Sequence, residues 1–198
     1  ENVGAVMQLV GERRGQLIRM DSQRSRTRME FEIPARGLIG LRSRLLCATQ
    51  GEAVIHHRFL KYDEFCGSIE GRANGVMIAT DTGQVTAYAL DQLADRGTMF
   101  VEPGDPVYEG QIVGEHCKSN DIPANVIRQK KLTNMRAASK DATVVLKAPL
   151  KMSLEEALEY IEQDELVEIT PKAIRLRKRL LRDIDRRRER RAAAREEP

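Results

Sequence analysis

The sequence has 198 residues, of which 41% are hydrophobic, 32% charged and 4% aromatic, and it contains no tryptophan. This length and composition are typical of one large or two modest folded domains with aliphatic cores, and they argue against a disordered chain. Three widely spaced cysteines are too few for a disulfide framework, and no apolar run of about 18 residues occurs. We therefore expect reduced thiols in a cytoplasmic protein with no membrane partner.

The first elements follow from hydrophobic periodicity. Apolar residues recur with helical spacing from Asn2 to Arg14, so we expect a helix capped by Asn2 that ends near Gly15. The segments Gln16–Met20 and Arg26–Ile33 predict two strands, because the second alternates with period two, and together they predict a β-hairpin.

A second helical pattern begins at Pro34 and ends at residues 49–51, and Ala53–Leu60 is typical of a further strand. The order helix, strand, strand, helix, strand indicates a ferredoxin-like split βαββαβ domain over residues 1–70 whose first strand is missing. That strand is central in this fold, so we expect a gap in the sheet and a chain that starts late.

Short β patterns with turn signals follow from Gly75 onward. We expect strands at Val76–Thr80, Gln84–Leu90, Thr98–Val101 and Val107–Gly114, a spacing that favours a small barrel or sandwich.

The last third of the chain predicts one more strand at Thr143–Leu146 and then a helix. Ser153 followed three residues later by Glu156 is the pattern of a capping box. Two strands are expected at Leu166–Ile169 and Ala173–Leu176, which makes residues 71–198 a β-rich domain. The fold class is thus α+β.

The modest net charge of +3 hides an uneven distribution. Between Lys118 and Lys140 six basic residues accompany one acidic residue; residues 141–171 hold two basic and eight acidic residues, and residues 172–198 hold twelve basic and five acidic. Basic stretches of this kind favour a polyanionic partner, because cations that replace counterions on phosphates gain free energy by counterion release.

A basic loop at residues 118–140 is the strongest candidate for such a contact, since structureless segments of about twenty residues are uncommon in compact domains. Its cations and amides can bind phosphates, bases or 2′-hydroxyls, and it lacks aromatic residues for base stacking. The RNA-binding candidates are Lys118, Asn120, Arg128, Lys130, Lys131, Asn134, Arg136 and Lys140. Secondary candidates in the following basic segment are Arg175, Arg177, Lys178 and Arg179.

Three alternatives stay open. Asn120 and Asn134 could instead form Asx-type turns that hold the loop. The charged tail, residues 186–198, cannot bury a core but is able to form a helix, and for Arg186–Arg195 taken alone we favour a merely solvated segment. Pairing of the acidic segment with the basic tail, or of both with other proteins, would make the chain a protein-interaction scaffold.

No signature of catalysis or of metal binding is found. The chain has no G-x-x-x-x-G-K-[ST] phosphate loop, no zinc-type spacing among its cysteines and histidines, and no nucleophile elbow. We expect a region without catalytic, cofactor or metal residues.

Five stretches carry a family resemblance: "ARGLIGLRS", "NGVMIATDTGQVTAYAL", "PGDPVYEGQIVGEH", "SNDIPANVIRQKKLTNMRA" and "DELVEITPKAIRLRKR". Together they resemble the C-terminal part of the BipA/TypA translational GTPases, with residues 1–70 similar to domain V of elongation factor G and residues 71–198 similar to the domain specific to that family. The resemblance implies a monomeric, ribosome-associated protein that acts in ribosome assembly and in growth under stress or cold. It also implies GTP and Mg in a domain upstream of this chain, and it places the loop at residues 118–140 near large-subunit rRNA and the tRNA acceptor end.

Overall fold

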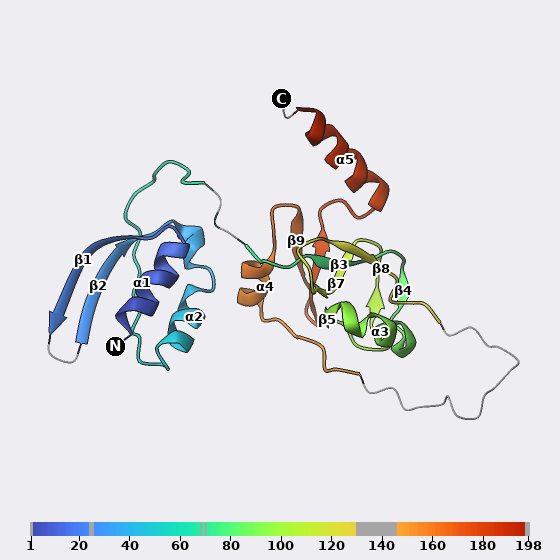
Figure 1. Cartoon of the computed structure of the whole chain (residues 1–198), viewed down its shortest axis with the longest axis horizontal. Coiled ribbons are helices and arrows are strands. Elements are labelled where there is room, and N and C mark those ends of the chain that lie inside the picture. The colour runs from blue at the N-terminus through green and yellow to red at the C-terminus, as the bar shows by residue number, and fades with distance from the viewer. Residues whose placement is uncertain (1, 24–25, 68, 70, 130–145, 197–198) are drawn as a thin grey trace, which may run out of the picture. The chain divides into compact units, whose positions relative to one another are not determined.

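The computed structural model describes residues 2–23, 26–67, 69, 71–129 and 146–196. The chain divides into two compact units, Glu1–Gly71 and Arg72–Pro198, which are coloured from blue to cyan and from green to red in Figure 1.

The first unit combines two helices with a β-hairpin (Figure 1). Strands β1 and β2 pair antiparallel, with a register shift between Leu17 and Arg19. Val10, Leu41 and Leu45 form the buried core of this unit. The predicted first helix and hairpin are confirmed, but the side chain of Asn2 makes no capping hydrogen bond, which corrects the predicted cap. The elements are α1 (Val3–Glu12), β1 (Gln16–Gln23), β2 (Arg26–Glu32), the 3-10 helix η1 (Ala35–Leu38) and α2 (Leu41–Ala48).

The single helix expected from Pro34 is two helices in the structure. The break lies at Gly40, which precedes α2 with a φ of 67°, a left-handed conformation that glycine adopts without a steric penalty. The turn brings Leu41 and Leu45 onto the buried face of α2.

The strand expected at Ala53–Leu60 is wrong, because this segment has no strand pairing. In a split βαββαβ sheet the fourth strand pairs only with the first, and in the described residues no strand precedes α1. Ile55 still packs against the core, while Val54 and Phe59 are exposed. An alternating pattern alone could not form a strand without its partner.

The second unit is built on an open sheet whose strands follow the order β8-β3-β7-β10-β9, with β5 paired to β7. Strands β4 and β6 form a separate two-stranded sheet. No closed barrel is formed by the described residues, which corrects the expectation of a small barrel. The strands are β3 (Val76–Ala79), β4 (Gly83–Gln84), β5 (Gly97–Met99), β6 (Pro106–Val107), β7 (Gln111–His116), β8 (Ile122–Ala124), β9 (Glu165–Ile169) and β10 (Ile174–Lys178).

Strand β3 lies inside this sheet, between β8 and β7, and is buried on both faces. Met77 and Ala79 point into one core cluster together with residues of α3 (Ala87–Leu93), whereas Val76 and Ile78 point into a second cluster with Ala157 of α4 (Leu154–Tyr160). The two helices therefore cover opposite faces of the sheet (Figure 1). A continuous apolar run is the expected sequence of such a strand.

The strand expected at Gln84–Leu90 is also wrong, since this region holds only the short β4 followed by α3. The hydroxyl of Thr86 accepts a hydrogen bond from the amide of Ala89 and caps the helix. Leu90 and Leu93 then lie buried three residues apart, which a strand would place on opposite faces.

The capped helix and the last two strands agree with the sequence, whereas the strand expected at Thr143–Leu146 lies largely outside the described residues. Ser153 and Glu156 form the complete capping box at the start of α4, and β9 and β10 pair antiparallel. A final helix, α5 (Asp183–Glu196), occupies the charged tail. Among the described residues, no helix is long and apolar enough to cross a membrane.

Candidate nucleic-acid interface

The N-terminal part of the predicted basic loop belongs to the folded sheet. Ile122–Ala124 forms β8, which pairs in parallel with β3, and the carbonyl of Lys118 accepts a hydrogen bond of 2.7 Å from the amide of Gly75. A carboxylate oxygen of Asp121 accepts a hydrogen bond of 2.9 Å from the amide of Val76. The expectation of one loop over residues 118–140 is therefore corrected, because the residues up to the end of β8 belong to the folded sheet.

The chain is held once more where it leaves the sheet. Thr86 donates its amide to the carbonyl of Val126 at 3.0 Å and its hydroxyl to the carbonyl of Arg128 at 2.6 Å. Asn125 accepts a hydrogen bond from the amide of Ile127 at 3.2 Å, an Asx turn. Backbone positions up to Arg128 are thus determined by contacts within the unit.

Three of the eight primary candidates lie in the described region, and their side chains face solvent. Lys118, Asn120 and Arg128 are exposed, and none of the three has an ion pair with another described residue. The carbonyl of Asn120 lies 2.7 Å from the ring nitrogen Nδ1 of His116, so the backbone is fixed and the side chain stays exposed. The remaining candidates lie outside the described residues: Lys130, Lys131, Asn134, Arg136 and Lys140.

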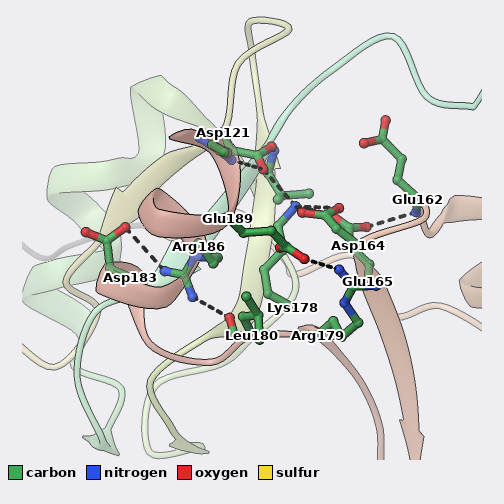
Figure 2. A network of polar contacts seen from close by, with 12 residues as sticks. Asp121, Glu162, Asp164, Glu165, Lys178, Arg179, Leu180, Asp183, Arg186 and Glu189 are labelled. Atoms are coloured by element: carbon green, nitrogen blue, oxygen red, sulfur yellow. Dashed lines mark hydrogen bonds and ion pairs between the residues drawn. The ribbon is translucent and has the colours of Figure 1, made fainter. Parts of the chain in front are cut away.

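Lys178 is removed from the secondary candidates, because its side chain is only 1% exposed. Its ammonium lies 2.8 Å from carboxylate oxygens of Asp121 and Glu165 and 3.0 Å from one of Asp164 (Figure 2). An ammonium that three carboxylates surround inside the fold cannot meet a phosphate. The sequence held a signal for this burial, since Lys178 lies two residues after the buried Leu176 and therefore on the same face of β10.

A second buried cation completes this network. The guanidinium of Arg72 donates two hydrogen bonds, of 2.5 and 2.6 Å, to the carboxylate of Glu165. Burial disfavours the charged form, but the hydrogen bonds and the charge of Glu165 outweigh it and raise the pKa of Arg72. Carboxylate oxygens of Glu162, Asp164 and Glu165 lie close enough together to hold a metal ion. Lys178 and Arg72 already neutralise this group, so we assign no metal to it.

The other secondary candidates are less enclosed. Arg175 lies 3.5 Å from Glu168 across the strand pair β9 and β10, and both side chains are partly exposed. Arg177 is half-buried. Arg179 is exposed and forms an ion pair with Glu189 of α5.

Helix α5 was missed as part of the candidate surface, because the sequence indicated a solvated tail. Arg186 of this helix is largely buried and donates hydrogen bonds to the carbonyl of Leu180 (Figure 2) and to that of Leu181. Arg190 approaches Asp121 at 3.7 Å. One signal could have indicated the helix: Asp183 and Asp185 lie in its first turn, where carboxylates stabilise a helix.

Comparisons with known proteins agree with this two-part organisation. Residues 74–183 match the TypA/BipA C-terminal domain family, and residues 1–72 match the elongation factor G C-terminus family. The chain is 48% identical over 190 residues to the large ribosomal subunit assembly factor BipA of Salmonella typhimurium, which covers 95% of this chain and 31% of that protein. The protein of the same name from Escherichia coli K12 is 48% identical over 194 residues, or 97% of this chain and 32% of its own length. That from Synechocystis is 50% identical over 177 residues, or 89% of this chain and 30% of its own length. The chain thus spans about a third of the length of these relatives.

Proposed function

Because the chain belongs to the TypA/BipA family, we propose that it is the ribosome-binding C-terminal region of a translational GTPase that acts in assembly of the large ribosomal subunit. The basic segment 118–140 binds ribosomal RNA and approaches the tRNA acceptor end. In this proposal GTP and Mg bind a domain outside this chain, and the whole protein supports growth under stress or cold. The region itself acts in the cytoplasm as a monomer without catalysis.

One observation carries this proposal: the start of the basic segment is fixed in the fold, while its two described cations, Lys118 and Arg128, are exposed. The carbonyl of Arg128 accepts the hydroxyl of Thr86, and its guanidinium faces solvent. A contact prepared in this way loses less conformational freedom on binding than a flexible chain does. The first residues of the segment therefore have fixed backbone positions, and the segment carries the positive charge that attracts phosphates.

A protein-interaction scaffold is the second candidate, and it is favoured by exposed apolar residues on the acidic helix α4. Leu154 and Leu158 are 40% and 43% exposed. However, the pairing of Lys178 with Asp164 and Glu165 joins the basic and acidic segments within one unit. These charges then attract an external partner less strongly, which weakens this alternative.

The test replaces Lys130, Lys131 and Arg136 together by alanine and measures binding to large ribosomal subunits over a range of salt concentrations. Each lost phosphate contact lowers the slope of log K against log salt by about 0.7–0.9, so three contacts lower it by roughly 2. An unchanged slope removes the loop from the contact surface.

A control variant carries the same charge change elsewhere on the second unit: Arg96, Lys151 and Lys172, all exposed, are replaced by alanine. This variant keeps the original salt slope if the loop is the contact. Ribonuclease treatment of the captured complexes separates the two functions, because a protein partner stays bound and an RNA-mediated complex is lost.

A further inference from the structure

Helix α5 carries its charges on separate faces. At 3.6 residues per turn, four arginines and one isoleucine fall within an arc of about 100°, and the acidic residues of the helix all fall outside this arc. The face, called here the arginine face, consists of Ile184, Arg187, Arg188, Arg191 and Arg195. All five are exposed.

The opposite side of α5 holds the helix against the second unit. Arg186, on that side, donates hydrogen bonds to the carbonyls of Leu180 and Leu181, and Glu189 forms an ion pair with Arg179 (Figure 2). Arg190 points toward Asp121, the carboxylate that Lys178 also binds.

These contacts are polar. A cavity of about 140 Å³ between α5 and β8 is lined in part by charged side chains, among them Asp121, Asp183, Arg186 and Arg190. A merely solvated tail needs no hydrogen bonds or ion pairs to the rest of the unit. A helix that presents one face in a fixed direction does need them.

The arginine face is only weakly neutralised by the protein itself. Arg187 lies 2.7 Å from Asp183 and Arg188 lies 3.9 Å from Asp185, but these are exposed pairs within one helix. Such pairs contribute little free energy and exchange readily for a phosphate. Arg191 and Arg195 have no ion pair with any described residue. A phosphate backbone thus meets four available guanidinium groups.

We propose that the arginine face of α5 is a second RNA-binding surface, which contacts the phosphate backbone of ribosomal RNA independently of the basic loop. This inference rests on the proposed function, because it takes ribosomal RNA as the partner. From Arg187 to Arg195 the face extends about 12 Å along the helix, enough to meet several phosphates of a strand.

The composition of the face favours RNA over a protein partner. Protein interfaces combine arginine with aromatic residues and methionine around a largely apolar core, whereas this face has no aromatic residue and Ile184 as its single apolar side chain. Arginine binds phosphate through two parallel hydrogen bonds. The contact is therefore expected to read the backbone and not the base sequence.

The test replaces Arg187, Arg191 and Arg195 together by glutamine in the 198-residue chain, and it leaves Arg186 and Arg190 in place so that the helix stays attached. Binding to a protein-free transcript of large-subunit ribosomal RNA is measured against salt. We expect a salt slope lower by roughly 2 and an affinity at low salt reduced at least about tenfold.

Two matched variants complete the experiment. Replacing the same three residues by lysine keeps the charge and restores the slope. Replacing Arg19, Arg26 and Arg28 of the hairpin by glutamine removes the same charge from the first unit and leaves the slope unchanged. Circular dichroism confirms that α5 stays helical in the glutamine variant.

The outcomes separate this inference from the proposed function. If the variant of Lys130, Lys131 and Arg136 lowers the slope and the glutamine variant of α5 does not, the arginine face is no RNA surface and the loop proposal stands. If only the α5 variant lowers it, the arginine face is the RNA contact and the loop proposal fails. Unchanged slopes in both variants overturn both, and loss of binding to whole subunits without loss on the transcript assigns the arginine face to a ribosomal protein.

Discussion

The ammonium of Lys178 lies 2.8 Å from a carboxylate oxygen of Glu165, and both side chains are almost completely buried. Removing one partner of a buried pair leaves an uncompensated charge, so we expect Lys178→Ala to lower the free energy of unfolding of the second unit by about 3–5 kcal/mol. Urea denaturation measures this change. As a control, Lys151→Ala breaks an exposed pair with Glu102 and costs at most about 1 kcal/mol. A loss of that small size for Lys178→Ala would contradict the network.

The same network predicts sensitivity to acid. Burial alone would raise the pKa values of Asp121 and Glu165, but hydrogen bonds from Lys178 to both, and from Arg72 to Glu165, lower them below their ordinary values of 3.8 and 4.5. A carboxyl group with a lowered pKa in the folded state contributes stability above its unfolded pKa, and this stability is lost as the pH falls through the lower folded value.

Unfolding free energy is therefore expected to be constant from neutral pH to about pH 5 and to decline below that pH. The decline should be weaker in Glu165→Gln, which has one titrating group fewer, although this variant is less stable at neutral pH. Urea denaturation at several pH values between neutral pH and pH 3 measures the decline in both proteins. Equal acid sensitivity of the two would exclude Glu165 as a source of the effect.

The sequence was most informative where structure depends on neighbours along the chain. The hairpin β1–β2 follows from alternation, and the capping box of α4 from Ser153 and Glu156, because both patterns are satisfied locally. Strand β8 was hidden by Pro123 and by its parallel partner β3, which is distant in sequence. For segment 53–60 the sequence predicted a strand that the structure does not contain, because an alternating pattern forms a strand only where a partner strand is present.

The candidate interface follows the same division. Charge counts located the basic segment, in which Lys118 and Arg128 are exposed, and its contact with RNA stays a prediction. Charge counts could not show which cation is paired with carboxylates inside the protein. Lys178 and Arg175 are three residues apart, yet only Lys178 lies among three carboxylates. That distinction depends on Asp121 and Asp164, which reach the site from different elements.

Attachment of α5 depends on a close approach of two backbones. Gly110 has a φ of 86°, and a Cβ atom there would lie 2.6 Å from the Cα atom of Leu181, just before α5. We expect Gly110→Ala to cost about 2–5 kcal/mol of unfolding free energy, from the left-handed conformation and from the displaced backbone. It should also increase amide hydrogen exchange in α5.

Gly104→Ala is the matched control, because Gly104 also has a positive φ, of 94°, but a Cβ atom there meets nothing within 4 Å. This variant carries the conformational cost alone, about 1–2 kcal/mol. Equal losses in the two variants would show that the approach to Leu181 is not tight.

Thr86 links a helix cap to the basic segment, and its hydroxyl has two roles. It accepts from the amide of Ala89 at 3.2 Å and donates to the carbonyl of Arg128 at 2.6 Å. Thr86→Val removes the hydroxyl with little change in volume, and we expect a loss of about 0.5–2 kcal/mol of stability from the lost cap. The start of the basic segment is then less ordered, which costs about 0.5–1 kcal/mol of binding free energy, or roughly a 2- to 5-fold higher Kd for ribosomal RNA. Thr86→Ser keeps the hydroxyl and should retain both properties; a Val variant that binds RNA as the original chain does would show that anchoring at Arg128 makes no contribution to binding.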